Sequence, residues 1–160
     1  MIANTSPSIE PLYALAYKRE HVLHDETMYE VSPQVVAYLK KHQLYSASVS
    51  EQIYRKGSIR GIRKLPAAAK KLLKISTEIP FRYHLKHQQA FQKFTDNAVS
   101  KTINLPRHSR IEDIDKIYRM AWKLGLKGTT VYRDACRSRQ VLSTLTPASD
   151  VHHYHQASGS

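Results

Sequence analysis

Polar side chains that can bind a ligand gather in the stretch FTDNAVSKTINLP, residues 94–106. In a β-strand, Asn97 shares a face with Val99 and Ile103, whereas Ser100, Thr102 and Asn104 share the opposite face. That second face is small and hydroxylated. It suits either a surface that orients a polar ligand or a set of buried groups that satisfy neighbouring backbone, and the sequence leaves both interpretations open.

The histidines raise the question of a metal site. His84 and His87 stand three residues apart in HLKH, and the C-terminal HHYH contains His152, His153 and His155. Neither group has the Cys or acidic partners, at metal-ligand spacing, that make such a signal specific. We therefore expect a pair on a helix surface and a cluster in a tail.

A reactive thiol is the second chemical candidate. Cys136 lies in RDACRSR among three arginines, which would lower the pKa of an exposed thiol. The sequence offers this thiol no second cysteine and no fixed base, so it indicates a reactive cysteine only weakly. The sequence contains no GxGxxG, Walker loop, HExxH or GxSxG.

Basic residues interleave with Tyr54 in YRKGSIRGIRK, residues 54–64, in a chain of net charge +12. Such a run can bind phosphates and stack bases. The commoner explanation, which we favour, is a solvated surface with Ile59 and Ile62 anchoring a turn.

Two strands and one helix must position the polar stretch. We expect a strand over about Ala98–Leu105, ended by Pro106, and a second strand over Leu126–Asp134. Between them, Ser109 and Glu112 form a capping box, and Gly125 stops the helix. The expected buried stripe of that helix is Ile111, Ile114, Tyr118, Ala121, Trp122 and Leu124 or Gly125.

Strand, helix and strand make a βαβ unit with parallel strands and a right-handed crossover. Ligand sites gather at the carboxyl ends of such strands, where Asn104 and residues 132–134 lie. The sequence therefore predicts an α/β protein with a polar pocket at this edge.

Shorter elements precede this unit. We expect a helix from Pro80 to Phe94 with His84, His87, Gln88, Phe91 and Phe94 roughly on one side. Further helices are expected from Pro33 after the N-cap Ser32, over Ser50–Lys56 before Gly57, and from Pro66 with a stripe of Ala68, Leu72 and Leu73. Residues 12–23 form a strand or a short helix. The short basic helices are interpreted as an elaboration, not as the core.

Bulk properties bound the class of protein. The chain has 160 residues, the size of one domain, and no apolar run near the roughly 20 residues of a membrane span. Its N-terminus does not have the pattern of a secretory signal, and a single cysteine fits a reducing compartment. The cytoplasm is the default location.

Three blocks, read together, resemble a known family: SIEPLYALAYKR, HQQAFQKFTDNAVSKTINLP and AWKLGLKGTTVYRDACRSRQVL. They look like the C-terminal part of the catalytic chain of class II, adenosylcobalamin-dependent ribonucleotide reductases. The blocks occur in the same order across roughly residues 2–142, and AFQK followed by DNAVSKTIN and Pro is very specific.

The resemblance implies a fold and an incomplete active site. The fold would be the C-terminal βαβ portion of a ten-stranded α/β barrel with short helical elaborations, over residues 1–142, followed by a disordered tail over 143–160. In that family a thiyl radical, formed through cobalamin cleavage, abstracts hydrogen from the ribose. The radical cysteine and the loop that holds substrate phosphate lie upstream of the matched region, and the family's cysteine-rich tail is missing.

The resemblance also implies partners and site residues. A chain carrying the radical cysteine would be needed, the substrate would be a ribonucleotide, and no membrane is involved. The residues expected to line the substrate or cofactor cavity, without performing the hydrogen abstraction, are Asn97, Ser100, Thr102, Asn104 and Tyr132. The chain alone should be inactive.

Departures from the family pattern occur at Ser8, where a glycine is usual, at YRDACR, and at Lys86 and His87. They suit either a split enzyme or a gene remnant. The alternative function from another class is a small basic nucleic-acid-binding module.

Overall fold

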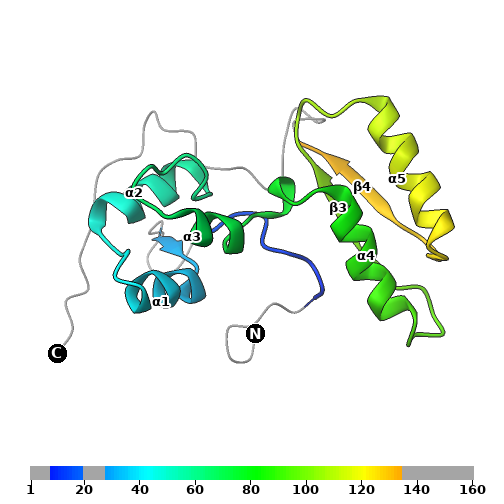
Figure 1. The fold of residues 1–160 in the computed structure, drawn as a ribbon, viewed down its shortest axis with the longest axis horizontal. Coiled ribbons are helices and arrows are strands. Elements are labelled where there is room, and N and C mark those ends of the chain that lie inside the picture. Colours follow the sequence, from blue (N-terminus) through cyan, green and yellow to red (C-terminus); the bar gives the residue numbers. More distant parts are fainter. Residues whose placement is uncertain (1–7, 20–27, 135–160) are drawn as a thin grey trace.

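The computed structural model describes residues 8–19 and 28–134, which form two lobes (Figure 1). One lobe contains β1, β2 and the helices α1–α3, and the other contains β3, β4, α4 and α5. A short 3-10 helix, η2 (Ser76–Glu78), lies between them in the sequence. Each lobe has its own cluster of buried apolar side chains.

The first lobe is a β-hairpin covered by helices. β1 (Ala16–Arg19) pairs antiparallel with β2 (Met28–Val31), and α1 (Pro33–Lys41), α2 (Ala47–Lys56) and α3 (Ala67–Leu72) follow. α2 ends at Gly57, whose φ of 63° is the left-handed conformation that glycine adopts without strain. The core of this lobe consists of Leu15, Ala16, Val31, Val35, Leu39, Val49, Ile53, Ile59, Ile62, Leu65, Ala69 and Ile75.

The short helices lie outside the βαβ unit, as predicted for elaborations, and they also enclose a hydrophobic cluster of their own. α2 begins three residues earlier than predicted, since the Ser46 hydroxyl caps it by accepting the Val49 N–H at 3.2 Å. The stripe predicted for this helix is wrong at Ala68 and Leu72, which are exposed, whereas Leu73 packs against the core. The buried residue of α3 is Ala69. The described part of the segment 12–23 contains the strand β1, so the strand alternative holds over Ala16–Arg19.

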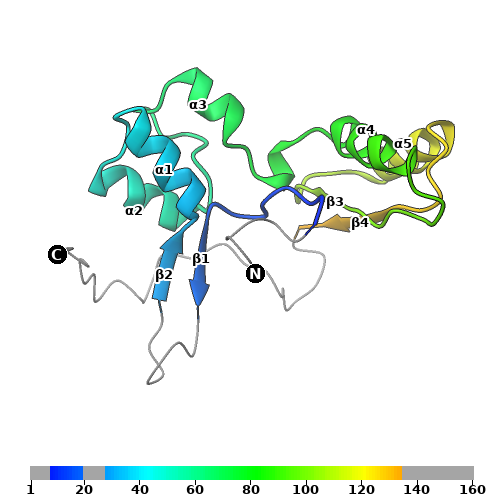
Figure 2. The ribbon, with the colours of Figure 1, turned by 90° about the horizontal axis from the view of Figure 1, so that it is seen from below.

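The second lobe is the predicted βαβ unit. β3 (Thr102–Leu105) and β4 (Thr130–Arg133) are parallel, with Ile103 opposite Val131 and Asn104 opposite Tyr132. α5 (Ile111–Lys123) connects them, and α4 (Phe81–Gln92) packs beside it. Figure 2 shows both helices on one face of the strand pair, and their side chains pack there against Ile103, Leu105 and Val131.

Boundaries and faces in this lobe differ from the predictions. Both strands are shorter than expected, because residues 98–101 and 126–129 are not paired as strands. The residue before α5 is Arg110 and not the predicted Ser109. The Arg110 N–H donates to the side chain of Asp113 and not to that of Glu112. The buried residues of α5 are Ile117 and Ala121, with Ile114 and Leu124 partly buried.

The stripe predicted for α5 is therefore wrong at three positions. Ile111 is 80%, Tyr118 49% and Trp122 80% exposed. On α4, His84 and Gln88 are buried on one side of the helix, but His87 and Phe91 are exposed. Phe94, where the helix was predicted to end, is exposed and lies beyond its last residue, Gln92. The two helices thus carry more apolar side chains than the two-stranded sheet can bury.

The N-terminal segment Ser8–Leu15 contacts both lobes (Figure 2). The Leu15 N–H donates to the Gly57 carbonyl at 2.7 Å, and the Leu12 carbonyl accepts the Ser76 N–H at 2.8 Å. Nearer the N-terminus of the segment, the Glu10 carboxylate accepts the Thr102 N–H at the start of β3. The segment therefore joins the two hydrophobic cores.

Within the described ranges, no helix is long and apolar enough to cross a membrane. Cys136, the histidines of HHYH and the predicted disordered tail over 143–160 lie outside the described residues.

Candidate functional site

The face of β3 and β4 that α4 and α5 leave uncovered carries polar side chains. Adjacent positions in a parallel pair point to the same side, so Thr102 and Thr130 share this face with Asn104 and Tyr132. Thr102, Asn104 and Tyr132 are half-buried. We call these four residues the polar strip.

The polar strip contains three of the five residues predicted to line a cavity. Thr102, Asn104 and Tyr132 come together on it, because strand alternation starts at Lys101 and holds through Leu105. Asn97 and Ser100 are exposed and precede β3, so they lie outside the strip. The Asn97 carbonyl instead accepts a hydrogen bond from the Gln92 side chain at 2.9 Å. A lining role for the strip stays a prediction.

A tyrosine distant in sequence borders the strip. The Tyr13 hydroxyl donates to Asp134 Oδ1 at 3.3 Å, just past the carboxyl end of β4. Burial, followed by the negative charge of Asp134 and the proximity of Tyr132, raises the pKa of Tyr13 to about 12. Sequence reasoning missed Tyr13, because 121 residues separate the two partners and no local pattern links them.

A buried ion pair lies at the amino end of β3. Lys101, with 1% of its side chain exposed, donates from Nζ to Glu10 Oε2 at 2.6 Å and to the Thr102 carbonyl at 3.1 Å. The other oxygen of Glu10 accepts the Thr102 N–H at 2.6 Å. Both polar groups of the Thr102 backbone are thus engaged by this pair.

Those backbone groups lie on the outer edge of β3. The carbonyls of Lys101 and Leu105 accept N–H groups of Thr130 and Asp134, so odd-numbered positions face β4 and even-numbered ones face away. Glu10 and Lys101 therefore occupy part of the edge where a further strand would pair.

His84 lies next to this ion pair. Its Nε2 donates to the Ser76 carbonyl at 3.0 Å, and within the part of the chain that the structure describes its Nδ1 is buried with no hydrogen-bond partner. Burial first, and then the charge of Lys101, lowers the pKa of His84, so the neutral ring is favoured. His87, exposed on the same helix, contacts the Phe91 ring edge-on, with 5.2 Å between ring centroids.

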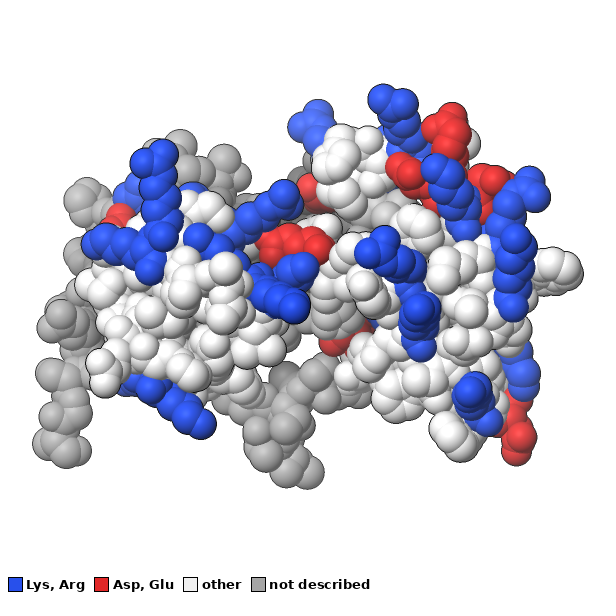
Figure 3. Space-filling model, in the orientation of Figure 1, with Lys and Arg blue, Asp and Glu red and all other residues white. Residues whose placement is uncertain are grey.

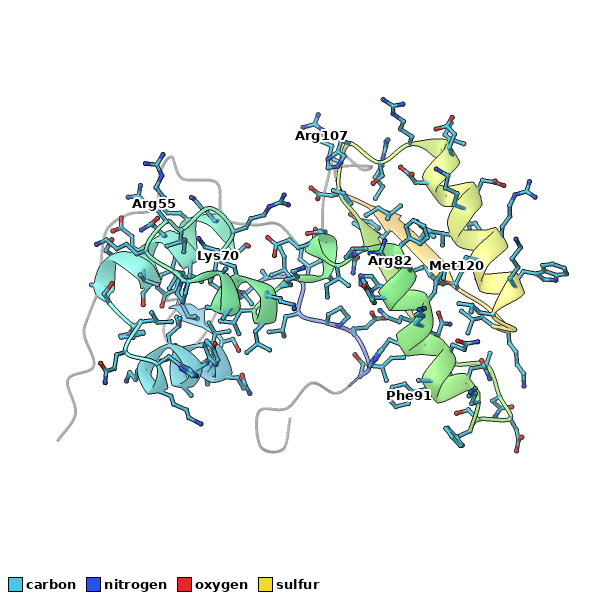
Figure 4. All side chains as sticks on the ribbon, viewed as in Figure 1. Arg55, Lys70, Arg82, Phe91, Arg107 and Met120 are labelled. Atoms are coloured by element: carbon cyan, nitrogen blue, oxygen red, sulfur yellow. The ribbon has the colours of Figure 1, made fainter. Side chains whose placement is uncertain are left out.

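A cavity of about 540 Å³ opens beside these groups, between residues 8–11 and α4. Ile9, Pro11, Ile79 and Phe91 give it an apolar wall, and Lys101 reaches its base. Figure 4 shows Phe91 near the C-terminal end of α4. No group of three or more His, Cys, Asp or Glu side chains that could hold a metal occurs among residues 8–19 and 28–134.

The basic run over residues 54–64 is anchored as predicted. Ile59 and Ile62 are 1% and 0% exposed, whereas Arg60, Arg63 and Lys64 point to solvent. Figure 3 shows Lys and Arg distributed over both lobes with few acidic neighbours on the lobe of α1–α3.

Glutamines of α4 hold the polar stretch that precedes β3. Gln88 donates from Nε2 to the carbonyls of Val99 and Gly128, at 2.8 and 2.7 Å. Gln92 accepts the Val99 N–H at 3.1 Å and donates to the carbonyls of Thr95 and Asn97. These side chains replace the missing strand ladder over residues 95–101, which explains how so polar a stretch is satisfied without being a strand.

Two parallel strands with helices on one face and polar side chains on the other are a portion of the wall of an α/β barrel. Comparison with known families agrees with this geometry. Residues 1–132 match the family described as "Ribonucleotide reductase, barrel domain", and the chain belongs to this family.

Two relatives show how much of the family the chain spans. A vitamin B12-dependent ribonucleoside-diphosphate reductase of Mycobacterium tuberculosis (strain H37Rv) is 37% identical over 147 residues, which are 92% of this chain and 20% of the relative. Its counterpart in Thermoplasma acidophilum is 38% identical over 146 residues, 91% of this chain and 19% of the relative. The chain therefore spans about a fifth of the length of these relatives.

Among solved structures, the α subunit of the class Id ribonucleotide reductase of Actinobacillus ureae superposes with a TM-score of 0.66 at 22% identity. The match covers 82% of this chain and 23% of that one. It supports the fold, a mixed α/β portion of the reductase barrel.

Proposed function

We propose that this chain contributes barrel strands to an adenosylcobalamin-dependent ribonucleoside-diphosphate reductase, as its C-terminal segment or as a split subunit. The relatives named above are vitamin B12-dependent reductases, and the chain spans about a fifth of them. The polar strip on the uncovered face of β3 and β4 is the observation that carries the proposal. Helices cover the outside of an α/β barrel, so the uncovered face is the one that looks into its interior.

In this proposal the strip shapes the cavity in which a ribonucleotide is reduced. Thr102 and Asn104 offer hydroxyl and amide groups to a polar ligand, and Tyr132 is held beside Tyr13 and Asp134. Asn97 lies outside the strip, in the turn that Gln92 braces, and Ser100 is an exposed residue between that turn and β3. None of these residues abstracts hydrogen from the ribose.

The described residues do not fit adenosylcobalamin on their own. The strip is two strands wide, with the strands about 4.8 Å apart, which is too narrow to enclose a corrin ring. The apolar cavity beside α4 offers no cluster of metal-ligating side chains. The remainder of the enzyme would hold the cofactor and supply the radical cysteine.

A reconstitution assay tests the proposal. The partner is the polypeptide, encoded in the same genome, that matches the other four fifths of the B12-dependent reductases. We expect this chain alone, supplied with adenosylcobalamin, a dithiol and a ribonucleoside diphosphate, to form no deoxyribonucleotide, and the mixture of both polypeptides to form it. Product from this chain alone, or none from a stable complex of the two, would refute the proposal.

A basic nucleic-acid-binding module is the second candidate, and one observation favours it. Residues 33–79 contain ten Lys and Arg against two acids, a net charge of +8, and Arg55–Glu51 is the ion pair found within that segment. Filter binding of single-stranded and duplex DNA at low and moderate salt tests this candidate. Retention that falls steeply with salt would support it, and no retention at low salt would remove it.

A further inference from the structure

We propose that the exposed apolar flank of α5, formed by Ile111, Tyr118 and Trp122, is the surface on which another helix of the reductase barrel packs. The inference rests on the proposed function and assigns the contact that joins this segment to the rest of the enzyme. We call these three residues the outer flank.

The outer flank is distinct from the side of α5 that packs on the strands. At about 100° per residue, it lies roughly 100° around the helix from the buried residues Ile117 and Ala121. The charged residues Asp115 and Arg119, which form an ion pair at 2.7 Å, lie beyond it. The helix therefore has two apolar stripes, and the described residues cover one of them.

The outer flank also points away from α4. Met120 lies about 80° from the buried residues in the other direction. It packs against the core shared with α4, and Figure 4 shows it on the side of α5 that faces α4. The neighbour of the outer flank must then come from outside the described residues, on the side where the helical layer of a barrel continues past α5.

The chemistry of the outer flank suits a protein helix. Ile111, Tyr118 and Trp122 follow one another at i, i+7 and i+11, the spacing of a helix–helix seam. Exposures of 80%, 49% and 80% are high for large apolar side chains, and a patch of this kind marks an interaction surface. Trp and Tyr are the side chains that most often anchor interfaces, and the adjoining ion pair gives a polar rim.

The length of the relatives identifies the occupant. About four fifths of each B12-dependent reductase corresponds to no residue of this chain. A parallel barrel needs a continuous layer of helices around its strands, and α4 and α5 supply two of them. A helix of that remaining portion, on the same polypeptide or another, is therefore the partner that fits.

Trp122 is the chain's single tryptophan, so it reports on the surface directly. We would label this chain with 5-fluorotryptophan and record its ¹⁹F resonance in H₂O and in D₂O, alone and in complex with the unlabelled reductase polypeptide used in the reconstitution assay. The expected result is a solvent-isotope shift for the isolated chain that is lost in the complex. Partner tryptophans do not contribute, because they carry no fluorine.

Binding measurements with matched variants complete the test. Trp122→Ala should weaken the complex at least tenfold, equivalent to about 1.4 kcal/mol, and Lys123→Ala, on the exposed charged face, should leave the affinity unchanged. Circular dichroism should show the same helix content for both, since neither residue is buried.

Three outcomes would overturn the inference. A complex in which Trp122 keeps its solvent-isotope shift would refute the outer flank as the contact while leaving the proposed function intact. So would a Trp122→Ala variant that stops self-association of this chain but binds the partner normally. No complex with the wild-type chain would refute the proposed function and this inference with it.

Discussion

The Glu10–Lys101 pair is the most consequential interaction between single residues in this chain. Lys101 is almost fully buried, and 91 residues of sequence separate it from Glu10. A buried ammonium is tolerated only when it is paired and hydrogen-bonded, which Glu10 and the Thr102 carbonyl accomplish. The pair thereby fixes the N-terminal segment to β3.

Replacing Lys101 by Met should destabilise the fold by about 3 kcal/mol, because the substitution leaves the Glu10 carboxylate without its cation in a partly buried position. Urea unfolding followed by circular dichroism measures the change. Arg119→Ala is the control, since it removes an exposed ion pair with Asp115 and should not move the midpoint. Equal midpoints for wild type and Lys101→Met would show that the pair contributes nothing.

His84 makes stability depend on pH in a predictable direction. Its pKa is lowered in the folded state, by burial and by Lys101, from an ordinary value of 6.5. The unfolded chain therefore binds the proton more readily, so the stability that the neutral ring contributes is complete above about pH 6.5 and is lost as the pH falls towards the lower folded pKa.

Urea midpoints at pH 7.5 and pH 5.5 test this, and His84→Gln should reduce the difference between the two midpoints. His87→Gln, at an exposed position of the same helix, should leave that difference as it is. An undiminished pH dependence in His84→Gln would contradict the assignment.

At the scale of elements, α4 acts as a brace through its glutamines. Gln88 spans from the segment before β3 to the loop before β4, and so it sets the spacing of the two strand entrances. Gln89 adds a bond of 3.1 Å to the Leu124 carbonyl, at the end of α5. The helix thus holds the βαβ unit by hydrogen bonds as well as by apolar contacts.

Gln88→Leu should cost about 2 kcal/mol, because the buried Gln88 side chain loses its bonds to two part-buried carbonyls at once. Gln89→Leu removes one bond from a less buried position and should cost about half as much. Hydrogen exchange of the β3 and β4 amides would locate the effect. Unchanged protection in Gln88→Leu would show that the brace is dispensable.

How far the sequence determines these elements can be judged from α5 and β3. Pro33, Gly57 and Gly125 mark ends of helices, and the βαβ order follows from local patterns, so these helices and the parallel pairing of β3 with β4 were predicted correctly. The strand β2 and its antiparallel pairing with β1 were not predicted. The faces of α5 were not, because Trp122 and Ile111 are as apolar as a core residue while lying outside the described core. The helical period of a sequence shows where apolar residues recur. It does not show which neighbouring element buries them.

The candidate site shows the same limit. Thr102, Asn104 and Tyr132 were found from strand alternation and strand ends. Tyr13, Glu10 and Lys101 were missed as a group, since their contacts join segments that are about 90 to 120 residues apart. Contacts of that range leave no periodic signal in the chain.

At the scale of the whole molecule, two lobes with separate cores share one N-terminal segment, and among residues 8–19 and 28–134 β3 and β4 form a parallel sheet of two strands. Parallel sheets are normally covered on both faces and continue on both sides. Among the described residues, the helices of the second lobe cover one face of its strand pair and leave the other face uncovered.

We expect the isolated chain to self-associate or to be poorly soluble, and to form a defined complex when co-expressed with the polypeptide that carries the rest of the barrel. Size-exclusion chromatography with light scattering distinguishes the two states. A monodisperse monomer that unfolds cooperatively, without any partner, would contradict the expectation.

Glu10 and Lys101 occupy part of the outer edge of β3, so self-association through strand edges would favour one arrangement over another. A head-to-tail fibre would need the β4 of one copy to hydrogen-bond along the β3 of the next, and the carboxylate of Glu10 already holds the Thr102 amide there. On the outer edge of β4, the backbone groups of Val131 and Arg133 have no such obstruction among the described residues. Two copies can join β4 to β4 about a two-fold axis, and that arrangement closes on itself. If copies associate through these strand edges, the Glu10 carboxylate therefore favours closed pairs over open fibres.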